Sequence, residues 1–265
     1  MNAKAAAVKS AKISEPSTTA SSVVTPDFDL QLNRDALGSF EATTQREWLV
    51  TNGIGGFASG TVGGCNTRRY HGLLIASLRP PVERTTMVAK IDATARYAGN
   101  SVSLATNEYA DGTIDPHGYR QLNSFRLEGQ TAIWTWLIGD ALLEQRVWMT
   151  HGENTTYVSY QVLRATDALE LELHPLCTFR DYHWQHHGHR DAALHALANG
   201  IEVVAYPDAQ PYRILLEGGQ YILDHQWYWN FKHREESARG LDDTEDLFRP
   251  AIITFNLKQG YHCKH

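Results

Sequence analysis

The sequence is poor in cysteine and has no paired-cysteine motif. Its three cysteines, Cys65, Cys177 and Cys263, include no CxxC spacing in a chain of 265 residues. A sparse and odd set of cysteines does not build a disulfide framework, and it is typical of proteins in a reducing compartment. We therefore expect a cytoplasmic protein.

Long hydrophobic runs are also missing, and no stretch approaches the roughly 20 apolar residues that span a membrane. The first 26 residues consist mainly of Ala, Ser, Thr and Lys, and Lys4, Lys9 and Lys12 interrupt any apolar core of a secretory signal. Because this segment has so little to bury, residues 1–26 are expected to form a disordered tail. The folded domain is then expected over residues 27–265, with no membrane partner.

An excess of positive charge is absent as well. The chain carries 24 Lys and Arg against 30 Asp and Glu, which gives a net charge of −6. This balance and the sequence pI near 6.1 argue against a nucleic-acid partner or an anionic membrane surface. The 42% of hydrophobic residues is ordinary for a globular protein.

Helical patterns are few, whereas two-residue alternation is common. The segment Thr85–Tyr97, followed by the turn-like Ala98-Gly99-Asn100 and "SVSLAT", predicts a hairpin. Gly152-Glu153-Asn154 predicts a second turn, and Gly218-Gly219 a third hairpin. The best helix candidate is "RDAALHALANG", residues 190–200. The expected fold is therefore mainly β: a large antiparallel β super-sandwich with few short helices.

The glycine-rich stretch from Thr51 to Leu74 raises the hypothesis of a phosphate-binding loop. Gly53–Ala58 fits G-x-G-x-x-A, but the residues that follow are not helix-forming, and no lysine occurs between Lys12 and Lys90. We therefore expect tight turns instead. The following "TRRYHGLLIA" is expected to be a strand, with Arg68 and Tyr70 on one face and Arg69 and His71 on the other. One pair would reach a cleft, while a lone arginine is more often half of a partly buried ion pair.

The loop "FRDYHWQHHGHR" brings together histidines, aromatic rings and a carboxylate. Its four histidines raise the hypothesis of a metal site, but their spacing matches no known zinc motif, and a solvated or cleft-lining loop is favoured. Tyr182 and Trp184, beside Arg180 and Asp181, are chemically suited to a hydroxyl-rich ligand such as a sugar.

The segment "HREESARGLDDTEDLFRP" carries six acidic residues. Glycoside hydrolysis needs two carboxylates on opposite sides of the scissile bond, and nothing in one acidic loop indicates such a pair. We expect a solvated, charge-rich connection. The sequence also contains no G-x-S-x-G elbow.

The stretch "EWLVTNGIGGFASGTVGGCNTRRYHGLLIA" resembles the N-terminal region of bacterial and archaeal-type glycogen debranching enzymes, the amylo-α-1,6-glucosidase family. "HPLCTFRDYHWQ" and the acidic segment resemble later signatures of the same region, so the resemblance covers roughly Trp48 to Leu257. It implies a β super-sandwich that packs on a C-terminal (α/α)6 barrel, which carries the catalytic acids that hydrolyse α-1,6 branch points of glycogen.

The resemblance also sets expectations for individual residues. The sequence ends where the barrel would begin, so the catalytic barrel is expected to be absent from this chain or supplied as a separate one. No catalytic acid, metal ligand or cofactor is assigned to the chain. The residues expected to face the barrel or its α-glucan substrate are Arg68, Arg69, Tyr70, His71, Arg180, Asp181, Tyr182, Trp184, Arg239 and Asp242.

Three functions remain open at this point. The first is a non-catalytic domain that docks on the barrel of a debranching enzyme and helps form the glucan cleft. The second is a self-standing α-glucan-binding module, which the loop aromatics favour. The third is an independent metallohydrolase built on the histidine loop.

Overall fold

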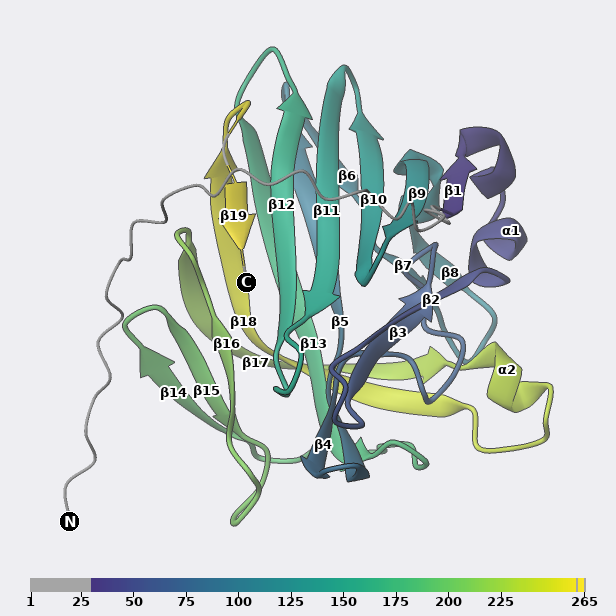
Figure 1. The fold of residues 1–265 in the computed structure, drawn as a ribbon, viewed down its shortest axis with the longest axis vertical. Coiled ribbons are helices and arrows are strands. Elements are labelled where there is room, and N and C mark those ends of the chain that lie inside the picture. Colours follow the sequence, from purple (N-terminus) through teal and green to yellow (C-terminus); the bar gives the residue numbers. More distant parts are fainter. Residues whose placement is uncertain (1–29, 261, 265) are drawn as a thin grey trace, which may run out of the picture.

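The computed structural model describes residues 30–260 and 262–264, and strands dominate it. The tail expected over residues 1–26 lies outside the described residues. In Figure 1 one sheet, the front sheet, lies over a second, larger sheet, the back sheet, and a small third sheet lies at the lower left. Neighbouring strands of the two large sheets pair antiparallel. The expected mainly-β, antiparallel sandwich is confirmed.

The two large sheets build the sandwich. In order across the sheet, the front sheet contains β1 (Leu30–Asn33), β9 (Leu122–Glu128), β10 (Thr131–Ile138), β11 (Ala141–Met149), β12 (Thr156–Arg164) and β19 (His262–Lys264). The back sheet contains β17 (Gln220–Lys232), β18 (Thr244–Leu257), β13 (Leu169–Asp181), β5 (Val82–Tyr97), β4 (Gly72–Arg79), β3 (Phe57–Thr61) and β2 (Glu47–Thr51), with β6 (Asn100–Ser103) beside β5.

Smaller elements decorate this frame. The third sheet contains β14 (Ala193–Leu197), β15 (Gly200–Val204) and β16 (Tyr212–Leu215), and a two-stranded ribbon contains β7 (Thr106–Glu108) and β8 (Ile114–His117). The helical elements are α1 (Phe40–Thr44), α2 (Arg234–Ser237) and the 3-10 turns η1 (Arg34–Leu37) and η2 (Gly118–Gln121). Each is short, as the weak helical patterns predict.

The main core lies between the front and back sheets. Trp134 and Trp136 on β10 meet Leu171 on β13 and Phe255 on β18, and all four side chains are buried. Trp134 packs edge-on against Trp48 with ring centroids 5.1 Å apart, while its indole N–H donates to the carbonyl of Val62. Alternating inward side chains of the two sheets therefore supply most of the apolar burial that stabilises the fold.

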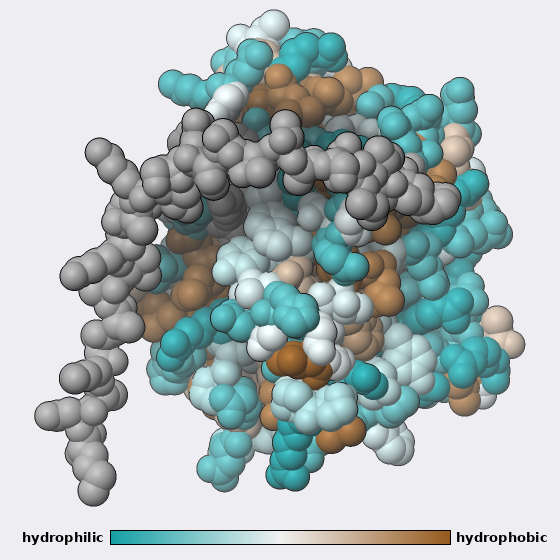
Figure 2. Space-filling view, viewed as in Figure 1, coloured by the Kyte–Doolittle hydropathy of each residue, from teal (hydrophilic) through white to brown (hydrophobic). Residues whose placement is uncertain are grey.

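A second core joins the third sheet to the back sheet. Ile201, Val203 and Tyr212 from β15 and β16 pack with Cys177 and Phe248 from β13 and β18. The third sheet is thus fastened to the lower part of the back sheet and is not a free hairpin. Figure 2 shows the outside of the molecule from the same side: mainly hydrophilic, with hydrophobic residues in separate small patches.

Two turn predictions are confirmed. β5 and β6 form the expected hairpin, with Tyr97 opposite Asn100, and residues 152–154 lie in the turn that joins the paired strands β11 and β12.

Two other local predictions are wrong. Residues 190–200 contain strand β14 and not a helix, because pairing of Ala193–Leu197 with β15 overrides the helix preference of Ala and Leu. Gly218-Gly219 does not close a hairpin, because β16 pairs with β15 whereas β17 pairs with β18. Among the described residues, no helix is long and apolar enough to cross a membrane.

Candidate functional site

The glycine-rich stretch forms a tight turn between β2 and β3, as predicted. The side-chain oxygen of Asn52 accepts hydrogen bonds from the backbone N–H groups of Ile54 (3.1 Å) and Gly56 (2.9 Å). Gly55 has φ of 100°, and a Cβ there would lie 2.6 Å from the carbonyl oxygen of Pro81. Because Asn52 occupies two of the turn's donors and strand β3 follows, the stretch lacks the helix N-terminus of a dinucleotide cradle.

The expected strand across residues 67–71 is a turn, so the predicted alternation of its side chains is wrong. The N–H of His71 donates to the carbonyl of Arg68 (3.0 Å), and β4 begins only at Gly72. The N–H of Thr67 donates to Nδ1 of His71 (3.0 Å), which closes the turn on its own side chain. Arg68 leaves the turn toward Glu47, with its Nε 2.7 Å from a carboxylate oxygen.

His71 supports the turn from inside the protein. Its side chain is 3% exposed, and its Nε2 lies 3.4 Å from the carboxylate of Glu47. Because Nδ1 already accepts a hydrogen bond, the proton belongs on Nε2, where it faces that carboxylate. The bond from His71 and the neighbouring Arg68 together lower the pKa of Glu47 to about 2.

The turn and the loop after β13 meet in one cluster, which we call the tyrosine–arginine surface: Arg69, Tyr70, Arg84, Tyr182 and His183. The hydroxyl of Tyr70 lies 3.1 Å from Nδ1 of His183, and the Tyr70 and Tyr182 rings meet edge-on at 5.4 Å. Arg69 donates to the carbonyl of His183 (2.7 Å), and Arg84 donates to the hydroxyl of Tyr182 (3.2 Å). All five side chains are exposed or half-buried, although Nε of Arg69 is itself buried, so the cluster as a whole faces solvent.

A buried ion pair fixes this surface from below. The guanidinium of Arg180, at the end of β13, contacts both carboxylate oxygens of Glu245 on β18, and the two side chains are 3% and 2% exposed. The same guanidinium donates to the carbonyl of Arg69 (2.9 Å). His233 lies beside the pair, and burial together with the positive charge of Arg180 holds its pKa well below the usual range. Arg180 therefore positions the turn rather than facing solvent.

Glu236 gives the turn a second buried support. Its side chain is 0% exposed, and its carboxylate accepts a hydrogen bond from the backbone N–H of Arg69 at 3.3 Å. The side chains of Arg69 and Arg239 lie 3.5 and 3.3 Å from the same carboxylate. The acidic segment is thus only partly the solvated connection that we expect from sequence, because Glu236 and Glu245 are buried and paired with arginine.

The four histidines of the loop point to different partners. His183 contacts Tyr70, whereas the side chain of His187 lies 2.8 Å from Asp242. His186 is buried and hydrogen-bonded to the carbonyl of Gly188. Within residues 30–260, whose side chains the structure describes, no three His, Cys, Asp or Glu side chains gather in a way that could hold a metal ion.

Two surface cavities flank the tyrosine–arginine surface. The one on the side of β2 has a volume of about 610 Å³ and is bounded by Arg68, Tyr70 and Arg84 together with the glycine turn. The other, of about 490 Å³, is bounded by Arg180, Asp181 and Trp184, among others. Trp184 is 70% exposed, and the Asp181 carboxylate caps its loop by accepting the N–H of His183.

The structure thus brings together part of the set expected from sequence. Arg69, Tyr70 and Tyr182 share one surface, with Arg180 beneath it. Asp181 and Trp184 line the cavity of about 490 Å³, and Arg68 and His71 line the cavity of about 610 Å³. Arg239 contacts the carboxylate of Glu236, and Asp242 contacts the side chain of His187. Sequence reasoning missed Arg84, whose position in the alternating strand β5 gives no functional signal.

A family model for the N-terminal region of glycogen debranching enzyme matches residues 46–263. No curated protein matches the chain. Among solved structures, the chain is similar to one described as a candidate kojibiose phosphorylase from the human microbiome, at 12% identity and a TM-score of 0.33. That match covers 82% of this chain and 25% of the other, so the chain spans about a quarter of its length. On the family match, the chain belongs to the glycogen debranching enzyme N-terminal family.

Proposed function

We propose that this chain is the non-catalytic β-sandwich domain of a glycogen debranching enzyme, which docks on a catalytic (α/α)6 barrel and lends the tyrosine–arginine surface to the glucan cleft. Membership of the glycogen debranching enzyme N-terminal family supports the assignment to such an enzyme. The observation that carries the proposal is the meeting of the 67–71 turn and the 181–184 loop, which are distant in sequence, in one surface.

The chemistry of this surface suits an α-glucan at a domain seam. Two phenol hydroxyls, an imidazole and two guanidinium groups offer donors and acceptors for sugar hydroxyls, and the rings of Tyr70 and Tyr182 offer apolar faces. The buried ion pair and Glu236 hold the backbone of Arg69, so the side chains above it are presented with little loss of conformational entropy on binding.

The proposal assigns bond cleavage to the barrel and none to this chain. The purified 265-residue protein should release no glucose from glycogen limit dextrin, even at micromolar concentration. Release of glucose by this chain alone, retained after a second purification step, would contradict the proposal.

Docking is tested with the catalytic barrel of a family member, produced as a separate chain. Size-exclusion chromatography with light scattering should show a one-to-one complex, and Tyr70→Ala or Arg84→Ala should weaken it by about tenfold each, the loss of roughly 1.4 kcal/mol. Arg96→Ala, near the other end of β5 from Arg84 and 46% exposed, is the matched control and should leave the complex unchanged. Equal weakening by all three variants would contradict the assigned face.

A second candidate is a self-standing glucan-binding module, and the exposure of Trp184 favours it. This ring is 70% exposed beside Asp181 and Arg190, as a stacking platform for a sugar would be. Titration with maltohexaose should then quench tryptophan fluorescence saturably, and Trp184→Ala should abolish the change. A docking domain without its barrel should show no saturable change.

A further inference from the structure

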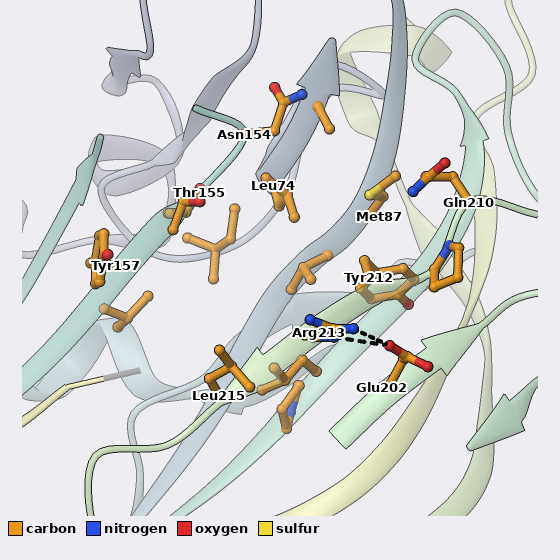
Figure 3. A pocket seen from close by; sticks show the side chains of 18 of the residues that line it. Leu74, Met87, Asn154, Thr155, Tyr157, Glu202, Gln210, Tyr212, Arg213 and Leu215 are labelled. Atoms are coloured by element: carbon orange, nitrogen blue, oxygen red, sulfur yellow. Dashed lines mark hydrogen bonds and ion pairs between the residues drawn. The ribbon is translucent and has the colours of Figure 1, made fainter. Parts of the chain in front are cut away.

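A third cavity, larger than the two that flank the tyrosine–arginine surface, lies away from that surface, between the front sheet and the third sheet. Its volume is about 810 Å³. Figure 3 shows Thr155 and Tyr157 on one side of it, Tyr212 and Leu215 on the other, and Leu74 among the side chains between them. The cavity is therefore a groove with two strand walls and an apolar floor.

Both walls present backbone edges to the groove. The lining includes the first three residues of β12, Thr156–Val158, and all four residues of β16, Tyr212–Leu215. Successive side chains of a strand point to opposite faces, so an unbroken run can line one cavity only when the edge of the strand faces it. The two walls of the groove are thus strand edges, and only its floor is a sheet face.

These edges are unpaired where they border the groove. Among the described residues, β16 pairs only with β15, and Thr156–Val158 of β12 pair only with β11. Within residues 30–260 and 262–264, the outward N–H and C=O groups of these edges pair with no other strand, as at an open sheet edge.

The register of the last strand leads into this groove. β19 runs antiparallel to β12, with His262 opposite Gln161 and Lys264 opposite Ser159. Each further residue in the same register moves one residue back along β12, toward Val158 and then Thr156. A polypeptide that continues β19 therefore enters the groove along the unpaired edge.

We propose that the groove is a strand-acceptor site, filled in a longer form of this protein by the polypeptide that follows β19, which pairs with Thr156–Val158 of β12. This inference rests on the proposed function, because it supposes that the domain is followed by further chain. The occupant is an extended segment with apolar side chains at alternate positions, which pack on Leu74 and Met87 of the floor.

The aliphatic floor argues against a sugar in the same place. Leu73, Leu74, Leu78, Val88 and Ile91 contribute no hydrogen-bonding side chain. At the rim, Arg213 is already engaged by Glu202, both guanidinium contacts being 2.9 Å. Over this floor a hydroxyl-rich ligand would lose its hydration without replacement partners, whereas apolar side chains of a strand would lose none.

The test compares two extended forms of the whole chain. One adds Thr-Val-Thr-Val-Thr-Val after the last residue. The matched control adds Thr-Pro-Thr-Pro-Thr-Pro, which has the same length but lacks an N–H group at every second residue and is disfavoured in a strand. Amide hydrogen exchange across Thr156–Val158 and the ¹³C-methyl signal of Met87 are recorded. Met149, in the main core, provides a reference signal that reports on the fold.

The valine extension should slow exchange across Thr156–Val158 by about tenfold or more and shift the Met87 methyl signal, whereas the proline extension should do neither. Equal exchange in the two forms overturns the proposal, and so does protection of Tyr212–Leu215 in place of β12. Because no glucan or barrel enters this experiment, its failure leaves the proposed function untouched.

Discussion

The buried pair between Arg180 and Glu245 makes the sharpest prediction about how this domain holds its functional surface. Glu245→Gln keeps the shape of the side chain but removes its charge. Arg180, 3% exposed, would then be left as an uncompensated buried cation. Because both partners are almost fully buried, solvent screening is small. Breaking such a pair costs about 3–5 kcal/mol.

The structure also predicts what a double replacement does. Arg180→Met with Glu245→Leu removes both charges, so the desolvation penalty disappears with the attraction. The remaining cost is that the backbone carbonyl of Arg69 loses the hydrogen bond that the Arg180 guanidinium donates to it at 2.9 Å. An unsatisfied group of this kind costs about 1–3 kcal/mol. The double variant should therefore be more stable than either single variant.

Urea unfolding followed by tryptophan fluorescence measures Arg180→Met, Glu245→Leu and their double variant, together with Glu245→Gln, against the parent chain. The single changes should each lower the free energy of unfolding by about 3–5 kcal/mol, and the double change by about 1–3 kcal/mol. Losses that simply add in the double variant, or single losses below about 1 kcal/mol, would show that the pair does not hold the site.

Three further outcomes are expected. Gly55→Ala should lower the free energy of unfolding in urea more than Gly64→Ala does, and the difference should be roughly 1–3 kcal/mol. Both have positive φ, but only a Cβ at Gly55 meets backbone, at 2.6 Å from Pro81; equal losses would refute this. Because its pKa falls from 4.5 to about 2, Glu47 stabilises the fold above pH 4.5 and loses that contribution as the pH drops toward 2. Glu47→Gln should therefore cost about 1 kcal/mol near neutral pH, a figure reduced for its 39% exposure, and almost nothing near pH 2; a loss that does not change with pH would contradict this. Burial raises the pKa of Cys65 to about 11 and that of Cys177 to about 12. Iodoacetamide at about pH 8 should therefore label neither thiol until urea is added. Peptide mass spectrometry detects the label, and labelling of the native protein would contradict the burial of these thiols.

The fold class was readable from sequence because period-two alternation reports directly on half-buried strands. The segment Thr85–Tyr97 shows this, and its turn with Asn100 formed as expected. Residues 190–200 show the limit of the approach. Their Ala and Leu residues favour a helix locally. The free energy gained by pairing with β15 and packing over the back sheet depends on distant residues and cannot be inferred from residues 190–200 alone.

The site was readable in its composition but not in its geometry. Arg69 and Tyr182, which are both expected from sequence to face the barrel or its substrate, lie on one surface, but the strand alternation used to orient residues 68–71 does not apply to a turn. The buried positions of Glu236 and Glu245 were also hidden. Their partners, Arg69 and Arg180, lie far away in sequence, and only the fold supplies a counter-charge that makes burial tolerable.

The pairing of β5 with β13 has a consequence for how the molecule comes apart. The two strands stay side by side from Tyr97 opposite Leu169 to Thr85 opposite Asp181. Along that length they contribute Ala95 to one apolar core and Met87 to the other. Neither core can melt without fraying strands that the other needs, so heat or denaturant should dismantle the sandwich and its third sheet in a single cooperative step.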